Sequence, residues 1–229
     1  MMPRLNPPQG VLFDLDGTLL DTAPDLAAAL NHVRAQQGLP RLSFAQIRPH
    51  VSHGSAALIK IGGDAPQSGE NFAAFQQALL QVYAANVACE TRLFEGMDLV
   101  LQELERRSRP WGVVTNKPRS LTTPLMRQLG LDRRAKIIVS GDTIAQKKPH
   151  PAPLLLAAGA LGVAPHRCLY VGDAERDIVA GKAAGMQTVT ALYGYIAENE
   201  FPEKWDADAT ISCAADLIPI LLLSSANVS

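Results

Sequence analysis

The sequence has 229 residues, of which 47% are hydrophobic, so it can bury a substantial core and does not have the composition of a disordered chain. This length fits one core domain with a smaller domain appended to it or inserted into it. The formal net charge of −1 excludes a global attraction to nucleic acid or to an anionic membrane. A small anionic ligand is compatible with this charge if positive side chains gather locally.

The three cysteines, Cys89, Cys168 and Cys213, are widely spaced and form no Cys-x-x-Cys pair. This pattern is typical of reduced thiols in a cytoplasmic protein and argues against a disulfide framework or a zinc site. The N-terminal residues lack the apolar segment of a secretory signal, and the apolar run at 217–223 is too short to span a bilayer. We expect a cytoplasmic monomer or homodimer with no nucleic-acid and no membrane partner.

The first predicted element is a buried strand at residues 11–13, and a helical region follows it. Residues 22–92 contain no good strand but four helical patterns. Pro24 opens the first helix, a capping box at 43–46 opens the second, and the third covers 55–61. The fourth places its apolar residues on one face, namely Phe72, Phe75, Leu79, Val82 and Tyr83. We therefore predict a helical cap domain at 22–93, inserted into a core formed by residues 1–21 and 94–229.

Four more apolar runs, at 111–114, 136–139, 169–171 and 187–191, are predicted to be strands. Helical patterns alternate with them, including one that Ser120 opens as an N-cap and Gly130 closes. Near-continuous apolar strands are typical of a sheet that is covered on both faces, and the alternation of strands and helices predicts a parallel sheet. The expected fold class is α/β: a doubly wound, Rossmann-like parallel sheet with an inserted four-helix cap domain.

Polar side chains follow these strands at the points where the strands end. The residues concerned are Asp14 and Asp16 after the first strand, Thr115 and Asn116 after the second, Lys148 between the third and fourth, and Asp173 and Asp177 after the fourth. In an open α/β sheet, ligands bind at the carboxyl ends of the strands. We therefore expect these side chains to share one site.

Several carboxylates in one crevice repel each other, by about 4 kcal/mol for a contacting pair at an effective dielectric near 20. A divalent cation relieves this repulsion, and Mg2+ prefers hard oxygen ligands together with water and a substrate phosphate. One carboxylate can then act as a nucleophile that forms an acyl phosphate, and a second carboxyl two residues on can serve as general acid and base. Lys148 would neutralise the phosphate, and Thr115 with backbone N–H groups would hold phosphoryl oxygens.

Each of these residues also has a structural interpretation when it is taken alone. Acidic residues or threonines at strand ends, such as Asp173 or Thr115, can be simple helix caps, and Lys148 can be a solvated surface lysine. The joint pattern in this order favours the catalytic interpretation. His150 and Lys147 are expected to be loop residues without a catalytic role.

Four segments in order resemble the motifs of the haloacid dehalogenase superfamily. VLFDLDGTLLDT at 11–22 resembles its first motif, VVTNK at 113–117 its second, KPHP at 148–151 its third and VGDAERDI at 171–178 its fourth. The third departs from the commoner form, which has Asp at the position of His150. The resemblance covers nearly the whole chain, and the predicted helical insert corresponds to the superfamily's cap.

The resemblance implies a phosphatase in which Asp14 is the nucleophile and Asp16 is the general acid and base. It also implies a Mg2+ cofactor held by Asp14, the backbone carbonyl of Asp16, and Asp173. Asp177 would bind the metal through a water molecule or support the other ligands. The expected partner is a small phosphorylated metabolite.

Within the superfamily, the phosphoglycolate phosphatase group is the most similar, on DTAPDL at 21–26, HG at 53–54 and TNKP at 115–118. The expected substrate is 2-phosphoglycolate, and the expected substrate-binding residues are Thr115, Asn116, Lys148, His53 and Gly54. Arg48 is a further candidate cation for the substrate's carboxylate. ALYGY at 191–195 with Trp205 downstream resembles a subgroup that hydrolyses N-acetylmuramic acid 6-phosphate, so both substrates stay open at this point.

Other functions fit the sequence less well. Dehalogenases of the superfamily lack an Asp at the position of Asp16, and its cation pumps need membrane helices. A sugar phosphomutase of the β-phosphoglucomutase type keeps all four motifs, but it returns an isomer where a phosphatase releases inorganic phosphate. A non-enzymatic phosphate-binding module would explain the clustered Asp and Lys but neither Asp16 nor the cap.

Overall fold

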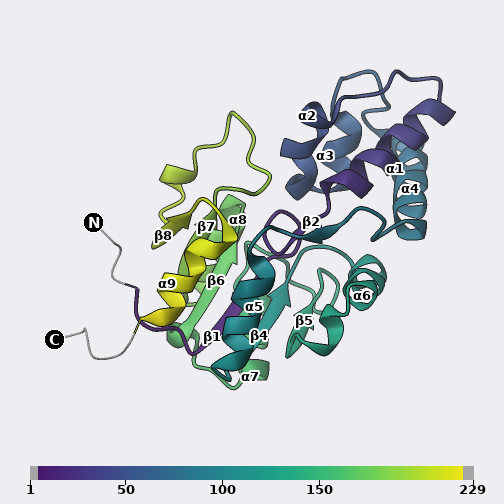
Figure 1. Cartoon of the computed structure of the whole chain (residues 1–229). Coiled ribbons are helices and arrows are strands. Elements are labelled where there is room, and N and C mark those ends of the chain that lie inside the picture. Colours follow the sequence, from purple (N-terminus) through teal and green to yellow (C-terminus); the bar gives the residue numbers. More distant parts are fainter. Residues whose placement is uncertain (1–4, 224–229) are drawn as a thin grey trace.

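A computed structural model describes residues 5–223 and contains a six-stranded sheet with helices on both faces (Figure 1). The strands of this sheet are β1 (Gly10–Phe13), β4 (Trp111–Val114), β5 (Ile137–Val139), β6 (Cys168–Gly172), β7 (Gln187–Ala191) and β8 (Ala209–Ile211). Their order is β5-β4-β1-β6-β7-β8, and every neighbouring pair is parallel. The predicted doubly wound α/β fold is confirmed.

Five helices surround this sheet: α5 (Met97–Arg106), α6 (Arg119–Gln128), α7 (Ala152–Leu161), α8 (Glu175–Ala183) and α9 (Leu217–Leu222). Short 3-10 segments connect the elements, namely η2 (Leu131–Arg133), η3 (Pro165–Arg167), η4 (Pro202–Lys204) and η5 (Ala214–Asp216). Successive side chains of a strand point to opposite faces. Val11 and Phe13 accordingly pack in one apolar cluster with α5, α6 and α9, while Leu12 packs in another with α7 and α8. Both faces of β1 are therefore buried, which explains its uninterrupted apolar sequence.

The helices α1 (Ala23–Gln36), α2 (Phe44–Ile47), α3 (Ser55–Lys60) and α4 (Gly69–Ala85), with the 3-10 segment η1 (Arg48–His53), group together at one end of the sheet (Figure 1). We call this group the insert. The predicted capping box opens α2, where Ser43 Oγ accepts from Gln46 N at 3.3 Å. Phe75, Leu79 and Tyr83 form the buried face of α4, as their spacing predicts.

A two-stranded antiparallel pair, β2 (Leu20–Asp21) and β3 (Arg92–Leu93), stands where the chain enters and leaves the insert. The expectation that residues 22–92 contain no strand missed the start of β3, because two residues are too few to establish a strand period. Asp25 connects the segment that enters the insert with the one that leaves it. Its carboxylate accepts hydrogen bonds from the N–H groups of Glu90 and Thr91 and from Thr91 Oγ1. The domain boundaries after residues 21 and 93 stay predictions.

One local expectation was wrong, and one strand was not predicted. Helix α6 begins at Arg119 with Pro118 as its N-cap, so Ser120 lies inside the first turn, although Gly130 follows the helix in a left-handed conformation as predicted. Strand β8 was not foreseen, because only Ile211 of its three residues is buried and the apolar pattern is weak.

Within residues 5–223, none of the helices has both the length and the apolar character that crossing a membrane requires.

Candidate active site

Three buried carboxylates meet at the carboxyl ends of β1 and β6. Asp14 follows β1, Asp173 follows β6, and Asp177 lies in the first turn of α8. The two strands are parallel neighbours with Phe13 opposite Val171, so residues that are far apart in the sequence end at the same place. One oxygen of each carboxylate lies within 4.8 Å of the others. The structure thus brings together three of the four acidic residues that the sequence singled out after these strands.

Lys148 supplies the positive charge at the centre of this cluster. Its Nζ lies 2.8 Å from Asp14 Oδ1 and 2.8 Å from Asp177 Oδ1, and its side chain is fully buried. The same ammonium donates to Val114 O at 2.9 Å and Tyr170 Oη at 2.8 Å. An ammonium held by so many oxygen atoms is fixed in position, so it can neutralise an anion beside Asp14 without moving.

The negative charge of the three carboxylates exceeds the positive charge that faces them. Burial raises the pKa of Asp14 above its ordinary value, Lys148 lowers it in part, and Asp177 raises it again. Burial, together with repulsion from Asp14 and Asp177, raises the pKa of Asp173 to about 7. A bound cation would remove this repulsion and let all three groups ionise.

The donor set therefore fits a hard divalent metal ion. It consists of carboxylate oxygens, which Mg2+ and Ca2+ prefer, and these oxygens are close enough to share one ion. Asp173 is already oriented for such a role, because Thr18 Oγ1 donates to its Oδ1 at 2.9 Å and Tyr195 N donates to its Oδ2 at 2.9 Å.

The loop after β1 approaches Asp173 so closely that only glycine fits at one position. Gly17 has a φ of 88°, and a Cβ atom added to it would lie 2.1 Å from Asp173 Oδ2. Both the left-handed backbone and the close contact require glycine there. This explains why Gly follows the second aspartate of the first motif.

Asp16 lies apart from the buried cluster, on the side of the insert. Its Oδ1 accepts from Lys117 Nζ at 2.8 Å and from Thr22 Oγ1 at 2.7 Å. Its side chain is 15% exposed, compared with 4% for Asp14. The two aspartates of the first motif thus have different surroundings, one deep beside Lys148 and one at the mouth of the site.

Thr115 and Asn116 follow β4 and border the same space. Thr115 Oγ1 accepts from Lys117 N at 3.1 Å, which leaves its hydroxyl hydrogen free for a ligand oxygen. Asn116 is used differently, because its side-chain amide donates to Lys148 O at 2.9 Å and accepts from Lys148 N at 3.0 Å. This reciprocal pair holds the Lys148 loop, so any contact of Asn116 with a substrate would come from its backbone.

A cavity of about 520 Å³ opens above these residues, and residues of the insert line its other side. Its lining includes Asp14, Asp16, Thr115, His53 and Gly54, so most of the expected substrate-binding residues face one space. His53 Nε2 also lies 3.6 Å from Glu200 Oε2. Apolar side chains of the insert complete the wall, among them Val51, Leu58 and Leu80.

Sequence reasoning missed several residues that the folded insert and loops bring to this cavity. Lys117, Arg176 and Tyr83 line it, and Ser52 Oγ donates to Asp173 Oδ2 at 2.7 Å. Lys117 and Arg176 stood inside the second and fourth motifs, where their charge was a usable signal. The sequence holds no such signal for Tyr83 and Ser52, because only the packing of the insert against the core brings them near the carboxylates.

Arg48 does not occupy the position that we expected for a substrate-binding cation. Its guanidinium donates to Tyr193 O and Gly194 O, both at 3.0 Å, and lies over the ring of Tyr195. These contacts join η1 to the loop after β7. Because its donors are used by the core and it does not line the cavity, Arg48 holds the insert against the core.

Comparison with known proteins shows to which family this chain belongs. The model of the family described as haloacid dehalogenase-like hydrolase matches residues 11–191. The chain belongs to this family. A phosphoglycolate phosphatase from Xanthomonas campestris pv. campestris (strain 8004) is 45% identical over 208 residues, which cover 89% of this chain and 92% of that one. The predicted superfamily and the predicted phosphatase class are confirmed.

Two further relatives of this hydrolase show the range of the family. An N-acetylmuramic acid 6-phosphate phosphatase from Pseudomonas putida is 38% identical over 213 residues, which cover 93% of this chain and 96% of that one. A solved structure from Haemophilus somnus 129PT, described as a predicted phosphoglycolate phosphatase, has a TM-score of 0.83 and 28% identity and covers 94% of this chain and 98% of that one.

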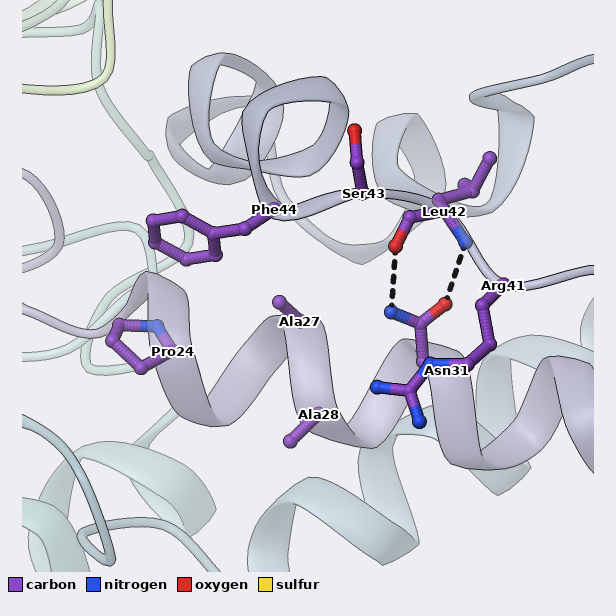
Figure 2. Close-up of a pocket in the computed structure, with 8 residues that line it drawn as sticks. All are labelled: Pro24, Ala27, Ala28, Asn31, Arg41, Leu42, Ser43 and Phe44. Atoms are coloured by element: carbon purple, nitrogen blue, oxygen red, sulfur yellow. Dashed lines mark hydrogen bonds between the residues drawn. The ribbon is translucent and has the colours of Figure 1, made fainter.

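The hydrolase has a second hollow, on the insert, which shares no lining residue with the cavity above Asp14. Figure 2 shows it between α1 and the segment that leads into α2, with Phe44 and Pro24 at one end and Arg41 at the other. The amide of Asn31 donates to Leu42 O and accepts from Leu42 N, both at 2.9 Å. This pair fixes the segment before α2 on α1.

Proposed function

We propose that this hydrolase removes the phosphate from 2-phosphoglycolate through an aspartyl-phosphate on Asp14. The observation that carries the proposal is the position of Asp14 on the wall of the cavity, 2.8 Å from the buried Lys148 ammonium. A carboxylate in that setting is held beside a fixed positive charge that a phosphate dianion also requires. The 45% identical phosphoglycolate phosphatase supports the choice of substrate.

In the first step, an oxygen of Asp14 attacks phosphorus and the bond from phosphorus to the ester oxygen breaks. The leaving oxygen takes a proton from the carboxyl group of Asp16, which lines the same cavity. The products are the aspartyl-phosphate and glycolate. Lys148 neutralises the charge on Asp14 and on the phosphoryl oxygens, and the Thr115 hydroxyl donates to one of them.

In the second step, a water molecule attacks the same phosphorus and gives a proton to the carboxylate of Asp16. The bond from phosphorus to the Asp14 oxygen breaks and releases inorganic phosphate. Both aspartates then return to their starting protonation states, so the cycle consumes one water and one ester. The contacts between the insert and the core would exclude bulk water during the first step.

We propose Mg2+ as the cofactor, held by Asp14, Asp173 and the backbone carbonyl of Asp16, with Asp177 as a direct or water-bridged ligand. Bound there, Mg2+ would supply positive charge to the phosphoryl oxygens and offset the repulsion among the carboxylates. The mutual proximity of the three carboxylates and the raised pKa of Asp173 support this assignment.

The free thiols support a cytoplasmic location.

N-acetylmuramic acid 6-phosphate is a second candidate substrate. The specific observation that favours it is the size of the cavity, about 520 Å³, which falls in the range of pockets that hold ligands much larger than a two-carbon acid. The apolar side chains on the insert wall could contact an N-acetyl group. The relative from Pseudomonas putida supports the same candidate.

The test is a comparison of kcat/KM for the two esters with Mg2+, measured as release of inorganic phosphate. We expect 2-phosphoglycolate to be preferred by about tenfold or more, on the scale of one charge-assisted contact. Preference for N-acetylmuramic acid 6-phosphate would establish the second candidate instead. Formation of a sugar phosphate isomer without release of phosphate would identify a phosphomutase and overturn both.

A further inference from the structure

Tyr83 of α4 has a hydroxyl group that finds no hydrogen-bond partner among the described residues. The side chain is fully buried, and it borders the cavity above Asp14. A buried hydroxyl without a partner costs free energy. Burial also raises the pKa of the Tyr83 hydroxyl, so the group keeps its proton and can donate it in a hydrogen bond to a ligand.

Lys117 lies directly against Tyr83, and it comes from the core rather than from the insert. Its Nζ is 4.5 Å from the centroid of the Tyr83 ring and 2.8 Å from Asp16 Oδ1. The side chain of Lys117 is 7% exposed and lines the cavity, so its ammonium group lies at the cavity wall.

The position of the Lys117 ammonium indicates which substrate carboxylates it can contact. Asp16 must reach the leaving oxygen to protonate it, and the Lys117 ammonium is within hydrogen-bond distance of Asp16. A group at the Lys117 ammonium is therefore close to the leaving oxygen as well. A carboxylate attached one carbon away from that oxygen stays near Lys117, whereas one at the far side of a sugar ring lies further from it.

We propose that Lys117 and Tyr83 form the subsite for a carboxylate that the substrate carries one carbon from its leaving oxygen, which makes α-phosphooxy acids the preferred substrate class. The Lys117 ammonium pairs with the carboxylate, and the Tyr83 hydroxyl donates to one of its oxygens. Because Tyr83 belongs to the insert and Lys117 to the core, the subsite is complete only when the two are in contact. This inference rests on the proposed function and deepens it.

The experiment compares wild type, Lys117→Met and Tyr83→Phe on three phosphate esters of similar size. These are 2-phosphoglycolate, 3-phosphooxypropanoate, whose carboxylate is one carbon further away, and 2-hydroxyethyl phosphate, which has none. The measured quantity is the ratio of kcat/KM for 2-phosphoglycolate to kcat/KM for 2-hydroxyethyl phosphate. A ratio cancels any general effect that Lys117→Met has on Asp16.

We expect Lys117→Met to lower this ratio roughly ten- to a hundredfold and Tyr83→Phe to lower it about tenfold, the usual scale for a lost charged or neutral contact. Tyr83→Phe should leave the melting temperature unchanged or raise it, because the hydroxyl has no partner to lose. The matched control is Lys60→Met, since Lys60 also lies over an aromatic ring, that of Phe72, but does not line the cavity. Its ratio should equal that of the wild type.

The outcomes separate this inference from the proposed function. If the wild type prefers 2-phosphoglycolate but both variants keep the wild-type ratio, the carboxylate subsite lies elsewhere and only this inference fails. If the wild type does not prefer 2-phosphoglycolate to 2-hydroxyethyl phosphate, the proposed substrate is wrong and the inference fails with it. A destabilised Tyr83→Phe with equal losses on all three esters would show that the hydroxyl supports the fold.

Discussion

Asp14 and Asp16 are two residues apart, yet their surroundings prepare them for different chemistry. Asp14 is buried against Lys148, whereas Asp16 is partly exposed and is held by Lys117 and Thr22. A nucleophile gains from a fixed cation that also attracts the phosphate, while a proton carrier must reach both the leaving oxygen and water. The turn that begins at Asp14, where the strand ends, separates the two roles in space.

Replacing Asp14 with Asn tests the role of the nucleophile. An amide is a poor nucleophile, so Asp14→Asn should lower kcat by about a hundredfold or more while the melting temperature stays near that of the wild type. Hydroxylamine should cleave a trapped phosphoenzyme in the wild type, and none should form in the variant. As a control, Asp16→Asn should still form the phosphoenzyme with p-nitrophenyl phosphate, whose leaving group needs little protonation. Retention of more than about a tenth of the activity by Asp14→Asn, far above the loss expected for a missing nucleophile, would exclude covalent catalysis there.

At the scale of elements, the contact between η1 and the loop after β7 decides how the insert meets the core. Arg48 donates to two carbonyl oxygens of that loop and lies over Tyr195. Tyr195 in turn donates to Asp21 Oδ1 and accepts from Ala23 N, where the chain enters the insert. One aromatic residue of the core thus contacts both η1 and the start of α1.

Removing the Arg48 guanidinium should weaken this contact without affecting the choice of substrate. We expect Arg48→Ala to lower kcat/KM by about tenfold, the scale of partly exposed charged hydrogen bonds, and to do so equally for 2-phosphoglycolate and p-nitrophenyl phosphate. Arg41→Ala, an exposed arginine of the same region, serves as the control and should change little. A loss confined to carboxylate-bearing esters would return Arg48 to the role of a substrate-binding cation.

At the scale of the whole molecule, the carboxylate cluster links stability to pH and to metal. The pKa of Asp173 is raised to about 7 in the folded protein, from an ordinary value of 3.8. Between about pH 4 and pH 7 the folded protein therefore binds a proton more tightly than the unfolded chain does. Stability that comes from this group is present at low pH and is lost as the pH rises through that window.

Thermal melting in EDTA should show this loss. We expect the melting temperature of the wild type to fall by several degrees relative to Asp173→Asn between about pH 5 and pH 8, at about 2–4 °C per kcal/mol for a chain of this size. Mg2+ should raise the melting temperature more at the higher pH than at the lower one, because it binds the ionised carboxylates. If the difference in melting temperature between wild type and Asp173→Asn stays the same across this pH range, Asp173 keeps an ordinary pKa.

Much of this molecule follows from local sequence. The apolar runs and their alternation with helices predict a parallel sheet covered on both faces, and parallel strands bring their carboxyl ends to one edge. Asp14, Asp16, Thr115 and Asp173 can therefore be assigned to one edge of the sheet from their places after the predicted strands, and Lys148 from its place in the segment between the third and fourth strands. Strand period and strand direction are short-range properties, so the sequence carries them directly.

Only the tertiary structure decided which residues of the insert meet that site and what several polar groups do. The packing of α4 brings Tyr83 against Lys117, and η1 brings Ser52 to Asp173 and Arg48 to the loop after β7. The amide of Asn116 is used by the Lys148 backbone rather than left for a ligand. These contacts join segments far apart in the chain, and no periodic pattern encodes them, because they depend on how the insert is oriented on the core.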